Sequence, residues 1–448
     1  MTGLARYDAV RRWLSVFAGS ALMVSVGSNH SISAWNAHLK NALGYSQAEI
    51  SLVCSMASFG AYFSVTPGYV FDRVGAHNSI LIGGGLLALA YLSVSYGVLT
   101  APQSMHPILV GLVFAVVGQA SNFGVFASLG PNEGLFGDEN RGKIMALQFA
   151  AFSGGGALFA LVYKTWFDNQ VASFFEFISW MFLVVFLSAW FATYRPRSPR
   201  DGEHEMKAMD EFVPDLPEDH GVLSPTHLHA AGLSVDVTGR RLLKDARFWL
   251  LFTTVFILVG ASLFIMANIA FIVESLDGNK AQVPTMVALF SIGNCAGRVI
   301  AGSVSDLVFS WCPRIYFVAV ASIFVAFNHI LLLVIPPSLL IIPIGLTGIA
   351  DGIMFAVFPV LTRETFGLKH FGKNFGMMSI ANALGFPLFY SPIGSYFYQM
   401  SSHSIDGVDK CIGLQCFRPV FILVVCLSAV AFAASLKFAT RQRYMSLP

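Results

Sequence analysis

The chain has 448 residues, of which 55% are hydrophobic and only 12% are charged, and its mean hydropathy is +0.66. Because soluble domains carry about 25% charged residues, this composition excludes a protein that is surrounded by water on every side. The net charge of +2 gives no reason to expect a nucleic-acid partner.

Twelve segments of the chain are long and apolar enough to cross a membrane. A spanning helix needs about 20 predominantly apolar residues. The segments lie near residues 13–36, 47–71, 78–100, 106–130, 142–164, 172–194, 247–274, 281–304, 314–335, 338–361, 372–399 and 416–438. A count of eleven stays open, because the third and fourth segments, and the ninth and tenth, are separated mainly by proline and small polar residues.

Lysine and arginine gather on one side of the predicted membrane. With twelve spans, both termini and every even-numbered loop share that side, and the opposite loops hold only Lys40, Lys164, Lys280 and Lys410. We therefore predict a multi-pass membrane protein with both termini in the cytoplasm. The same asymmetry favours twelve spans over eleven. The plasma membrane and a vacuole-like or lysosome-like endomembrane fit equally well.

Residues 195–246 interrupt the apolar pattern. This segment begins Arg-Pro-Arg-Ser-Pro-Arg and carries eight acidic residues between Asp201 and Asp219. It cannot bury enough apolar surface to order itself. We predict a flexible cytoplasmic linker between an N-terminal half, 1–194, and a C-terminal half, 247–448. Its four histidines match no closed metal-site spacing, so we predict no metal.

The two halves repeat short motifs. Gly68 and Asp72 recur 234 residues later as Gly302 and Asp306. A second set recurs 230 residues later, with Phe136, Gly137, Gly142 and Lys143 matching Phe366, Gly367, Gly372 and Lys373. Two similar halves around a mid-membrane cavity are typical of transporters. We therefore predict an all-α membrane protein with twelve transmembrane helices in two six-helix pseudo-repeats.

The second repeated motif also reads G-x-x-x-x-G-K, as in a phosphate-binding loop. That loop needs Ser or Thr next, whereas Ile144 and Asn374 follow here. Metalloprotease, nucleophile-elbow and zinc-ligand motifs are not found either. We predict that the protein is not an enzyme and does not hydrolyse ATP.

Two ionisable residues lie deep inside predicted helices, Arg298 in the eighth and Asp351 in the tenth. A charge in mid-membrane costs at least about 2.5 kcal/mol on insertion scales, which makes such residues functional candidates. The planar guanidinium of Arg298 suits a carboxylate or phosphate, so Arg298 is the main candidate for substrate contact. Asp351 is the candidate for coupling or gating. The structural alternative is that the two residues pair with each other or with helix carbonyls.

Neutral polar side chains on matching helices of the two halves mark the predicted cavity walls. Each of them serves equally well as a hydrogen bond between helices, worth only about 0.6 kcal/mol on average. His30 titrates near neutrality and is able to carry protons, although a structural histidine is the safer interpretation. The predicted substrate-binding set comprises Arg298, Asn294, Asn268, Asn122, Gln119, Asn382 and His30.

Cys411 and Cys416 lie beside the last non-cytoplasmic loop. A disulfide between them is expected in an oxidising compartment, with two free thiols as the alternative.

One loop carries a family resemblance. The run Gly68-Tyr69-Val70-Phe71-Asp72-Arg73-Val74-Gly75 lies between two apolar segments and resembles the signature loop of the major facilitator superfamily. The resemblance implies a cytoplasmic gate in which charge pairs hold the two halves together. The predicted gating residues are Gly68, Asp72, Arg73, Gly75, Arg141 and Asp306, with Asp351 as a coupling candidate. In the second half Leu307 stands where Arg73 stands in the first.

Three further stretches resemble the nodulin-like transporters, which are related to monocarboxylate porters. They are Asp245 to Phe252, Ser291 to Arg298, and Cys411 to Arg418. Monocarboxylate porters often show Asp-x-x-x-Arg in the eighth helix, where the pair couples a proton to an organic anion. Here Asn294 replaces the aspartate and cannot carry a proton, so coupling by that pair is in doubt. Asp351 or His30 is able to take its place.

We therefore predict a secondary active transporter of a small organic solute that works by alternating access. A monocarboxylate or another organic anion is the expected substrate class. Proton coupling is a hypothesis, and no cofactor is predicted. The predicted partners are the solute and the lipid bilayer, and the functional unit is expected to be a monomer. The alternative is a transporter-like receptor or sensor that binds solute without net transport.

Overall fold

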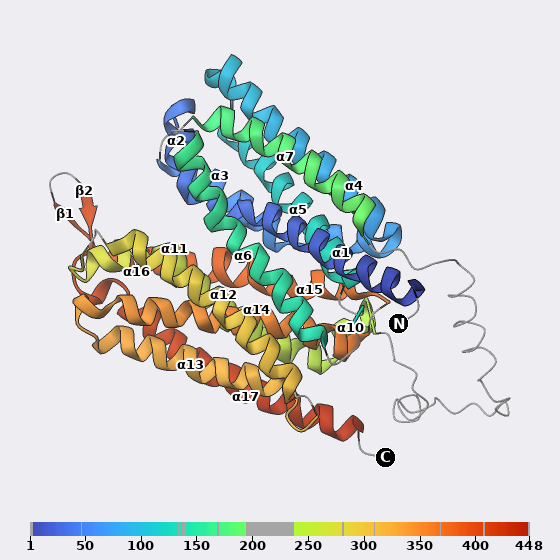
Figure 1. The fold of residues 1–448 in the computed structure, drawn as a ribbon. Helices are drawn as coiled ribbons and strands as arrows, with labels where there is room; N and C mark the ends of the chain where they lie inside the picture. Colours follow the sequence, from blue (N-terminus) through green and yellow to red (C-terminus); the bar gives the residue numbers. More distant parts are fainter. Residues whose placement is uncertain are drawn as a thin grey trace.

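The computed structural model describes residues 3–446 apart from 46, 133–134, 137–139, 168–169, 194–236, 280–281, 309, 368 and 406–407. The described chain is helical, with one short β-hairpin. Helices of the first half, blue to green in Figure 1, and those of the second half, yellow to red, form two bundles. Both termini lie at the same end of the molecule (Figure 1). Most of the predicted linker lies outside the described residues.

The first half begins with a helix that is interrupted by a 3-10 turn. Its elements are α1 (Gly3–Val26), the 3-10 turn η1 (Gly27–Ser31), α2 (Ile32–Leu43), α3 (Gln47–Tyr62), α4 (Val65–Thr100), η2 (Pro102–Ser104), α5 (Pro107–Asn132), α6 (Arg141–Trp166) and α7 (Val171–Ala192).

The second half begins after the short surface helix α10 (Arg240–Lys244). Its elements are α11 (Ala246–Ser275), α12 (Val283–Leu307), α13 (Ile315–Val334), η5 (Pro337–Leu339), α14 (Ile341–Phe366), α15 (Phe371–Ala383), the π-helix η6 (Leu384–Tyr390), α16 (Ser391–Met400), β1 (His403–Ile405), β2 (Val408–Lys410), η7 (Leu414–Cys416) and α17 (Arg418–Ser446).

Ten stretches of the described chain are long and apolar enough to cross a membrane. One of them, Leu52–Thr100, has 49 residues and contains two crossings, because a single crossing takes about 20. The broken helix α15–η6–α16 supplies a further crossing. The predicted all-α fold with twelve crossings is therefore confirmed.

The long α4 helix turns sharply at Gly75. Its φ of 76° and ψ of 176° interrupt the helix between the second and third crossings. Only glycine adopts this region without steric cost, because a Cβ atom would collide with the backbone. The predicted gating residue Gly75 thus makes the loop that carries Asp72.

Two inner helices are broken near their middle. The turn η1 interrupts the first crossing, and the π-helix η6 interrupts the eleventh around Pro387, which removes a helix hydrogen bond. Such breaks often occur at functional sites.

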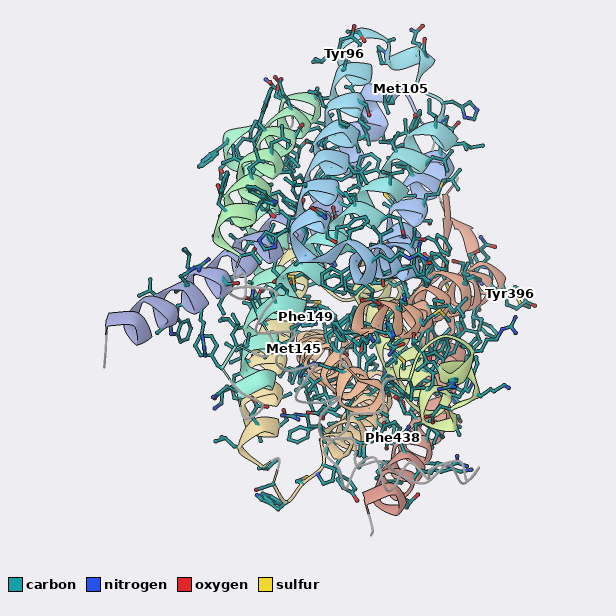
Figure 2. All side chains as sticks on the ribbon, turned by 90° about the vertical axis from the view of Figure 1, so that its right-hand side faces the viewer. Tyr96, Met105, Met145, Phe149, Tyr396 and Phe438 are labelled. Carbon is teal, nitrogen blue, oxygen red and sulfur yellow. A yellow bond between two sulfur atoms is a disulfide. The ribbon has the colours of Figure 1, made fainter. Side chains whose placement is uncertain are left out.

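The two bundles touch through helices whose backbones come very close. A Cβ atom added to Gly68 on α4 would lie 2.1 Å from the carbonyl oxygen of Gly372 on α15. A Cβ atom added to Gly302 on α12 would lie 2.3 Å from the Cβ of Ala146 on α6, and 2.9 Å from the carbonyl oxygen of Gly142. The repeated glycines of one half therefore meet those of the other. In the view of Figure 2, Phe149 of α6 lies near this junction.

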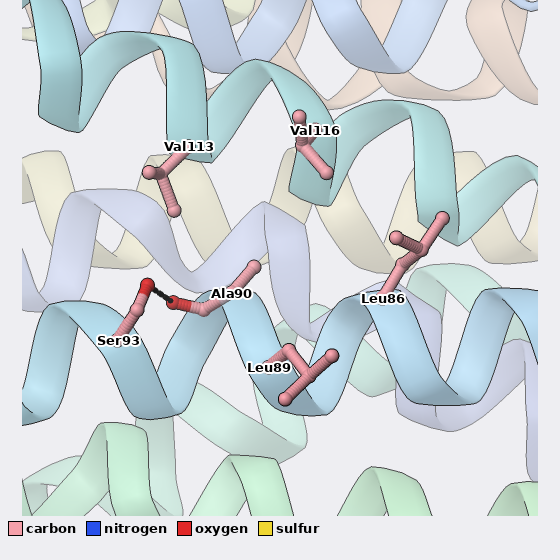
Figure 3. A pocket seen from close by; sticks show the side chains of 6 residues that line it. All are labelled: Leu86, Leu89, Ala90, Ser93, Val113 and Val116. Carbon is pink, nitrogen blue, oxygen red and sulfur yellow. Dashed lines mark hydrogen bonds between the residues drawn. The ribbon is translucent and has the colours of Figure 1, made fainter.

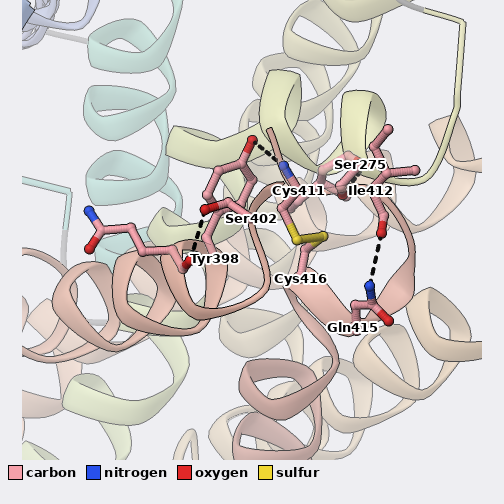
Figure 4. The surroundings of a disulfide bond; sticks show 9 residues. Ser275, Tyr398, Ser402, Cys411, Ile412, Gln415 and Cys416 are labelled. Carbon is pink, nitrogen blue, oxygen red and sulfur yellow. Dashed lines mark hydrogen bonds between the residues drawn. A yellow bond between two sulfur atoms is a disulfide. The ribbon is translucent and has the colours of Figure 1, made fainter. Parts of the chain in front are cut away.

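At the opposite end, a disulfide joins Cys411, which directly follows strand β2 in the chain, to Cys416 (Figure 4). The enclosed turn is anchored to α11, since the amide of Gly413 donates to the carbonyl of Ser275 at 2.7 Å. The Cys411 amide also donates to the Tyr398 hydroxyl at 3.4 Å. The last loop is thereby fastened to two helices of its own half.

Candidate functional site

Arg298 lies in the middle of α12 and is only 2% exposed. Its Nε donates to Oδ1 of Asn294 at 2.8 Å. The two residues are four apart, so they share one face of the helix. A buried guanidinium needs such acceptors, because burying an unpaired charge is very costly.

Asn294 also reaches the neighbouring helix α14. Its Nδ2 donates to Oδ2 of Asp351 at 2.6 Å. Among the described interactions Arg298 and Asp351 form no direct ion pair, and Asn294 bridges them. Close packing of α12 on α14 allows this: a Cβ on Gly352 would lie 2.2 Å from the Asn294 carbonyl oxygen, and one on Gly297 would lie 2.3 Å from that of Ile349.

The same cluster extends across the junction to α6 of the first half. Arg298 Nη1 donates to the backbone carbonyl of Phe149 at 3.0 Å, and the Ser153 hydroxyl donates to Asn294 Oδ1 at 2.8 Å. We call Arg298, Asn294, Asp351, Ser153 and the Phe149 carbonyl the central cluster. It joins the two halves at the level of the buried charges.

Two aromatic rings, whose centroids lie 6.5 Å apart, contact the guanidinium from adjacent sides. The Arg298 Cζ lies 4.7 Å from the ring centroid of Phe355 and 5.4 Å from that of Phe149. Ring faces attract a cation, by about 2 kcal/mol or more when water is excluded. Arg298 is therefore held by apolar surface on two sides and by oxygen acceptors at its nitrogens.

Asp351 is incompletely satisfied. It is 3% exposed, and its Oδ1 is buried with no hydrogen-bond partner. A buried polar atom without a partner costs about 1–3 kcal/mol, more when charged. Native proteins rarely keep such a group without a reason, and a missing proton, ion or ligand is a common one.

Two side chains of the first half, His30 and Tyr62, lie near this cluster. His30 in η1 has an exposed side chain, although it packs edge-on against Phe152 at 4.8 Å and lies within electrostatic range of Arg298. Tyr62 at the end of α3 is half-buried and lies within electrostatic range of both Arg298 and Asp351. These two side chains therefore bring polar groups of the first half close to the buried charges of the second.

The other predicted substrate-binding residues lie outside the central cluster. The amide nitrogen of Gln119 donates to the carbonyls of Gly60, at 2.7 Å, and Phe63. That of Asn122 donates to Ala61 at 2.9 Å. These bonds hold the break between α3 and α4.

The remaining two predicted residues belong to the second half. Asn268 on α11 donates to Phe264 of its own helix at 2.9 Å. Asn382 on α15 is buried just before η6, and its Oδ1 has no hydrogen-bond partner. Substrate contact by either asparagine stays a prediction.

Asp72 and Asp306 form matching caps between the halves. Asp72 accepts from the backbone amides of Gly372 and Lys373 at 3.0 and 2.8 Å, at the start of α15. Asp306 accepts from Gly142 and Lys143 at 3.1 and 2.8 Å, at the start of α6. Carboxylates satisfy free amides and favour the positive end of the helix dipole.

The charged neighbours of these caps differ between the halves. Arg73 lies over the Tyr69 ring at 4.3 Å, and Lys373 of the other half lies over the same ring at 5.1 Å. Asp306 instead pairs with Arg314 at 2.6 Å, and Arg314 also contacts Glu364. The side chain of Arg141 lies outside the described residues, so its predicted role stays open.

Sequence reasoning missed Ser153, Phe149 and Tyr62 as parts of the site. Ser153 precedes three consecutive glycines, Gly154-Gly155-Gly156, and such small-residue stretches are typical of close helix packing or bending. A serine in a small-residue stretch is only a weak indication of a binding site. A backbone carbonyl such as that of Phe149 gives no indication in the sequence, because every residue has one.

Two apolar recesses lie elsewhere, on the outer surface. The recess in Figure 3 lies between α4 and α5, and its one hydroxyl, from Ser93, donates to the Ala90 carbonyl at 2.7 Å. The other lies along the beginning of α1. Their exposed aliphatic side chains suit lipid, and neither recess offers a group for an anion. The first is lined by Leu86, Leu89, Ala90, Ser93, Val113 and Val116.

Comparison with known sequences gives one family match. A family model described as Major Facilitator Superfamily matches residues 17–327 and 250–446. A probable transporter MCH1 of Candida albicans is 22% identical over 433 residues, covering 94% of this chain and 90% of the relative. The uncharacterised MFS-type transporter YhjX of Escherichia coli is 22% identical over 378 residues, covering 84% and 85%.

Solved structures share the fold. The proton:xylose symporter XylE, bound to 6-bromo-6-deoxy-D-glucose, superposes with a TM-score of 0.70 at 15% identity and covers 96% of both chains. The transporter FucP in its outward conformation superposes with a TM-score of 0.58 at 12% identity, covering 97% of this chain and 99% of FucP.

Proposed function

This chain belongs to the major facilitator superfamily and is a multi-pass membrane transporter, and we propose that it carries a small carboxylate-bearing solute by alternating access. The observation that carries the proposal is the central cluster. Arg298 is a permanent cation buried between the two halves. A buried charge at that depth is costly and is retained where it has a task.

Arg298 is the proposed contact for the solute carboxylate. Its guanidinium presents several N–H donors in one plane, which matches the two oxygens of a carboxylate. In this structure Nη1 donates to the Phe149 carbonyl at 3.0 Å. A carboxylate is a stronger acceptor for a guanidinium than a neutral carbonyl, because the bond is charge-assisted on both sides. The solute would therefore replace Phe149 as the acceptor.

This exchange links binding to movement. The Phe149 and Ser153 bonds are contacts between α6 and α12, the same helices that Asp306 fastens about two to three turns away. Loss of the bond between Arg298 and the Phe149 carbonyl therefore removes one of the contacts that hold α12 against α6. The proposed opening at the end that carries Asp72 and Asp306 also requires the loss of the two carboxylate caps. We place that end in the cytoplasm, as the basic loops predict.

Asp351 is the proposed coupling residue. Its unpartnered Oδ1 needs either a proton or a donor from the solute. A proton there would neutralise the charge that a simple organic anion brings in, which is the rationale for proton coupling. Asn294 supports this role, because it connects Asp351 to Arg298 although it cannot itself exchange a proton.

The proposal is tested with purified protein in proteoliposomes. Small carboxylates, sugars and nucleosides are screened by thermal shift, since a ligand that binds only the folded state raises Tm. We expect carboxylates to raise the Tm of the wild type. Arg298→Lys keeps the charge but loses the planar fork, so we expect the carboxylate concentration needed for the same rise in Tm to increase at least tenfold. Ser188→Ala on α7 is the control, because that hydroxyl donates to Val184 of its own helix and lies outside every predicted site. Stabilisation by carboxylates that survives Arg298→Lys unchanged would contradict the assignment.

A receptor without transport is the second possibility, and no observation favours it. Cysteine labelling of positions around the central cluster from both membrane faces distinguishes the two. A transporter becomes labelled from each face in turn, whereas a sensor is expected to admit reagent from one face only.

A further inference from the structure

We infer that the solute is zwitterionic, a 2-amino acid whose carboxylate binds Arg298 and whose ammonium group binds Asp351. The inference rests on the proposed carboxylate contact at Arg298 and narrows the substrate class of that same site. At Asp351 it puts the ammonium group of the solute in place of the coupling proton. It follows from three properties of the central cluster: its charge balance, the open oxygen of Asp351, and the rings beside it.

The first property is charge. Arg298 contributes one positive charge to the central cluster, and Asp351 in its ionised form contributes one negative charge, so these two groups balance each other. Adding a simple organic anion would leave one uncompensated negative charge in a space shielded from water, where charge is expensive. A zwitterion adds no net charge and places each of its ends against the opposite charge of the protein. It therefore needs no accompanying proton.

The second property is the geometry of Asp351. Oδ2 is occupied by the Asn294 amide at 2.6 Å, whereas Oδ1 is buried without a donor. Asn294 also holds Arg298 through its Oδ1 at 2.8 Å. One asparagine side chain thus sets the separation between the guanidinium and the carboxylate. A ligand that spans the same two groups must carry its anion and its donor only a few bonds apart, as a 2-amino acid does.

The third property is the apolar lining. Phe355 and Phe149 contact the guanidinium with centroid distances of 4.7 and 5.4 Å. Phe152 and the exposed ring of His30 lie on the first-half side, 4.8 Å apart. Rings favour an apolar or aromatic remainder through area burial and ring contacts. A sugar would need several additional donors and acceptors that these rings do not provide.

The test uses ligands that differ only in their charged groups. Phenylalanine carries both charges, 3-phenylpropionate carries only the carboxylate, and phenethylamine carries only the ammonium. Alanine, propionate and ethylamine form the same series with a hydrogen atom in place of the ring. Each compound is titrated against the purified full-length protein by thermal shift and as a competitor of uptake into proteoliposomes.

In at least one series, we expect the zwitterion to raise Tm and to compete with uptake at a concentration at least tenfold lower than the carboxylate-only and ammonium-only compounds of that series. Uptake of that zwitterion should not respond to an imposed pH gradient. In Asp351→Asn the tenfold preference over the carboxylate-only compound should disappear. Asp277→Asn is the control, because Asp277 lies in an exposed turn at φ 55°, a conformation that asparagine also tolerates.

The possible outcomes distinguish this inference from the proposed carboxylate contact at Arg298, on which it rests. If the carboxylate-only compounds act as well as the zwitterions and their uptake follows the pH gradient, Asp351 carries a proton and the inference is overturned while the carboxylate contact stands. If no carboxylate compound binds, both are overturned. Because the wild-type series alone decides between these results, the test does not depend on Asp351→Asn folding.

Discussion

Asn294 and Asp351 are joined by a 2.6 Å hydrogen bond between helices α12 and α14, and this bond is the link between the two buried charges. Without it Arg298 and Asp351 would share no connection among the described contacts. The asparagine is thus the part of the site that sets how the charges are spaced. Its amide cannot titrate, so it keeps the same donor and acceptor pattern through a transport cycle.

We expect Asn294→Ala to weaken both folding and ligand recognition. The substitution leaves Arg298 Nε and Asp351 Oδ2 without their partner, and a buried group without a partner costs about 1–3 kcal/mol. The free energy of unfolding should fall by that amount, measured by denaturant titration in detergent. Asn268→Ala should change it by no more than about 0.6 kcal/mol, the average for a membrane hydrogen bond. Equal losses in the two variants would refute a special role for Asn294.

The repeated glycines lead to a prediction about the gate. Gly68→Ala would put a Cβ atom 2.1 Å from the Gly372 carbonyl, so α4 and α15 must move apart. We expect a population shift toward the state that is open at the Asp72–Asp306 end. Gly85→Ala on the same helix is the control, because a Cβ there meets nothing within 4 Å.

The readout for this pair is maleimide labelling of Phe375→Cys, a buried α15 position, with Cys54, Cys295, Cys312 and Cys426 replaced by serine. Labelling should be several-fold faster with Gly68→Ala than with Gly85→Ala. Identical rates would show that the α4–α15 contact does not control access.

How far the sequence predicts this molecule differs between its fold and its site. The helices follow from apolar length alone, and Arg298 and Asp351 stand out because charge is rare in lipid. Their neighbours do not stand out. Ser153 and Asn294 are 141 residues apart, and only the packing of α6 on α12 brings them together.

The gate shows the same limit. The sequence predicts charge pairs around Asp72, whereas the structure shows a carboxylate that caps the first amides of α15. No side-chain pattern reveals such a bond, because its donors are backbone groups that every residue has. Likewise, the polarity of Gln119 does not tell whether its amide faces a cavity or the end of α3, where it lies.

Arg314 should be important for stability rather than for substrate choice. It is 2% exposed and pairs with Asp306, while its other nitrogen contacts Glu364. Removing one partner of a buried pair costs about 3–5 kcal/mol, because the other charge is left behind. Arg314→Leu should lower the free energy of unfolding by that amount. Adding Asp306→Asn should restore part of it, and a strictly additive double variant would contradict the pairing.

Asp245 gives a prediction about pH. It precedes α11, and its carboxylate accepts from the Arg247 amide at 2.8 Å and from the Arg247 guanidinium at 2.6 Å. Burial alone would raise its pKa, but the hydrogen bonds and charge of Arg247 prevail and hold the pKa below its ordinary value. A lowered pKa contributes stability that is complete above the unfolded value, about 3.9, and is lost as the pH falls through the folded value.

Asp245→Asn should therefore destabilise the protein at pH 7 and make little difference at pH values below the folded pKa. Unfolding midpoints measured at both ends of this range test the sign. A variant that is equally destabilised at both would show that the carboxylate charge contributes nothing.

Ser153 is the residue at which binding and gating are separable. Its hydroxyl donates to Asn294 across the two halves at 2.8 Å, but it touches neither charge directly. The same hydroxyl lies 3.2 Å from the Phe149 carbonyl of its own helix, so Ser153→Ala removes that contact too. Of the two, only the bond to Asn294 depends on α6 and α12 being together. A net loss of about 1 kcal/mol from that state would shift the conformational equilibrium roughly fivefold toward opening at the Asp72–Asp306 end. Affinity for the solute should change little, since the guanidinium and Asp351 are unaltered.

Ser188→Ala is the control for Ser153→Ala, because the Ser188 hydroxyl donates to Val184 in its own helix. Solute-free labelling of Phe375→Cys should rise in Ser153→Ala and not in Ser188→Ala. If affinity falls while labelling stays constant, Ser153 positions the binding site and does not hold the gate, and the proposed link between Arg298 and opening would lose its support.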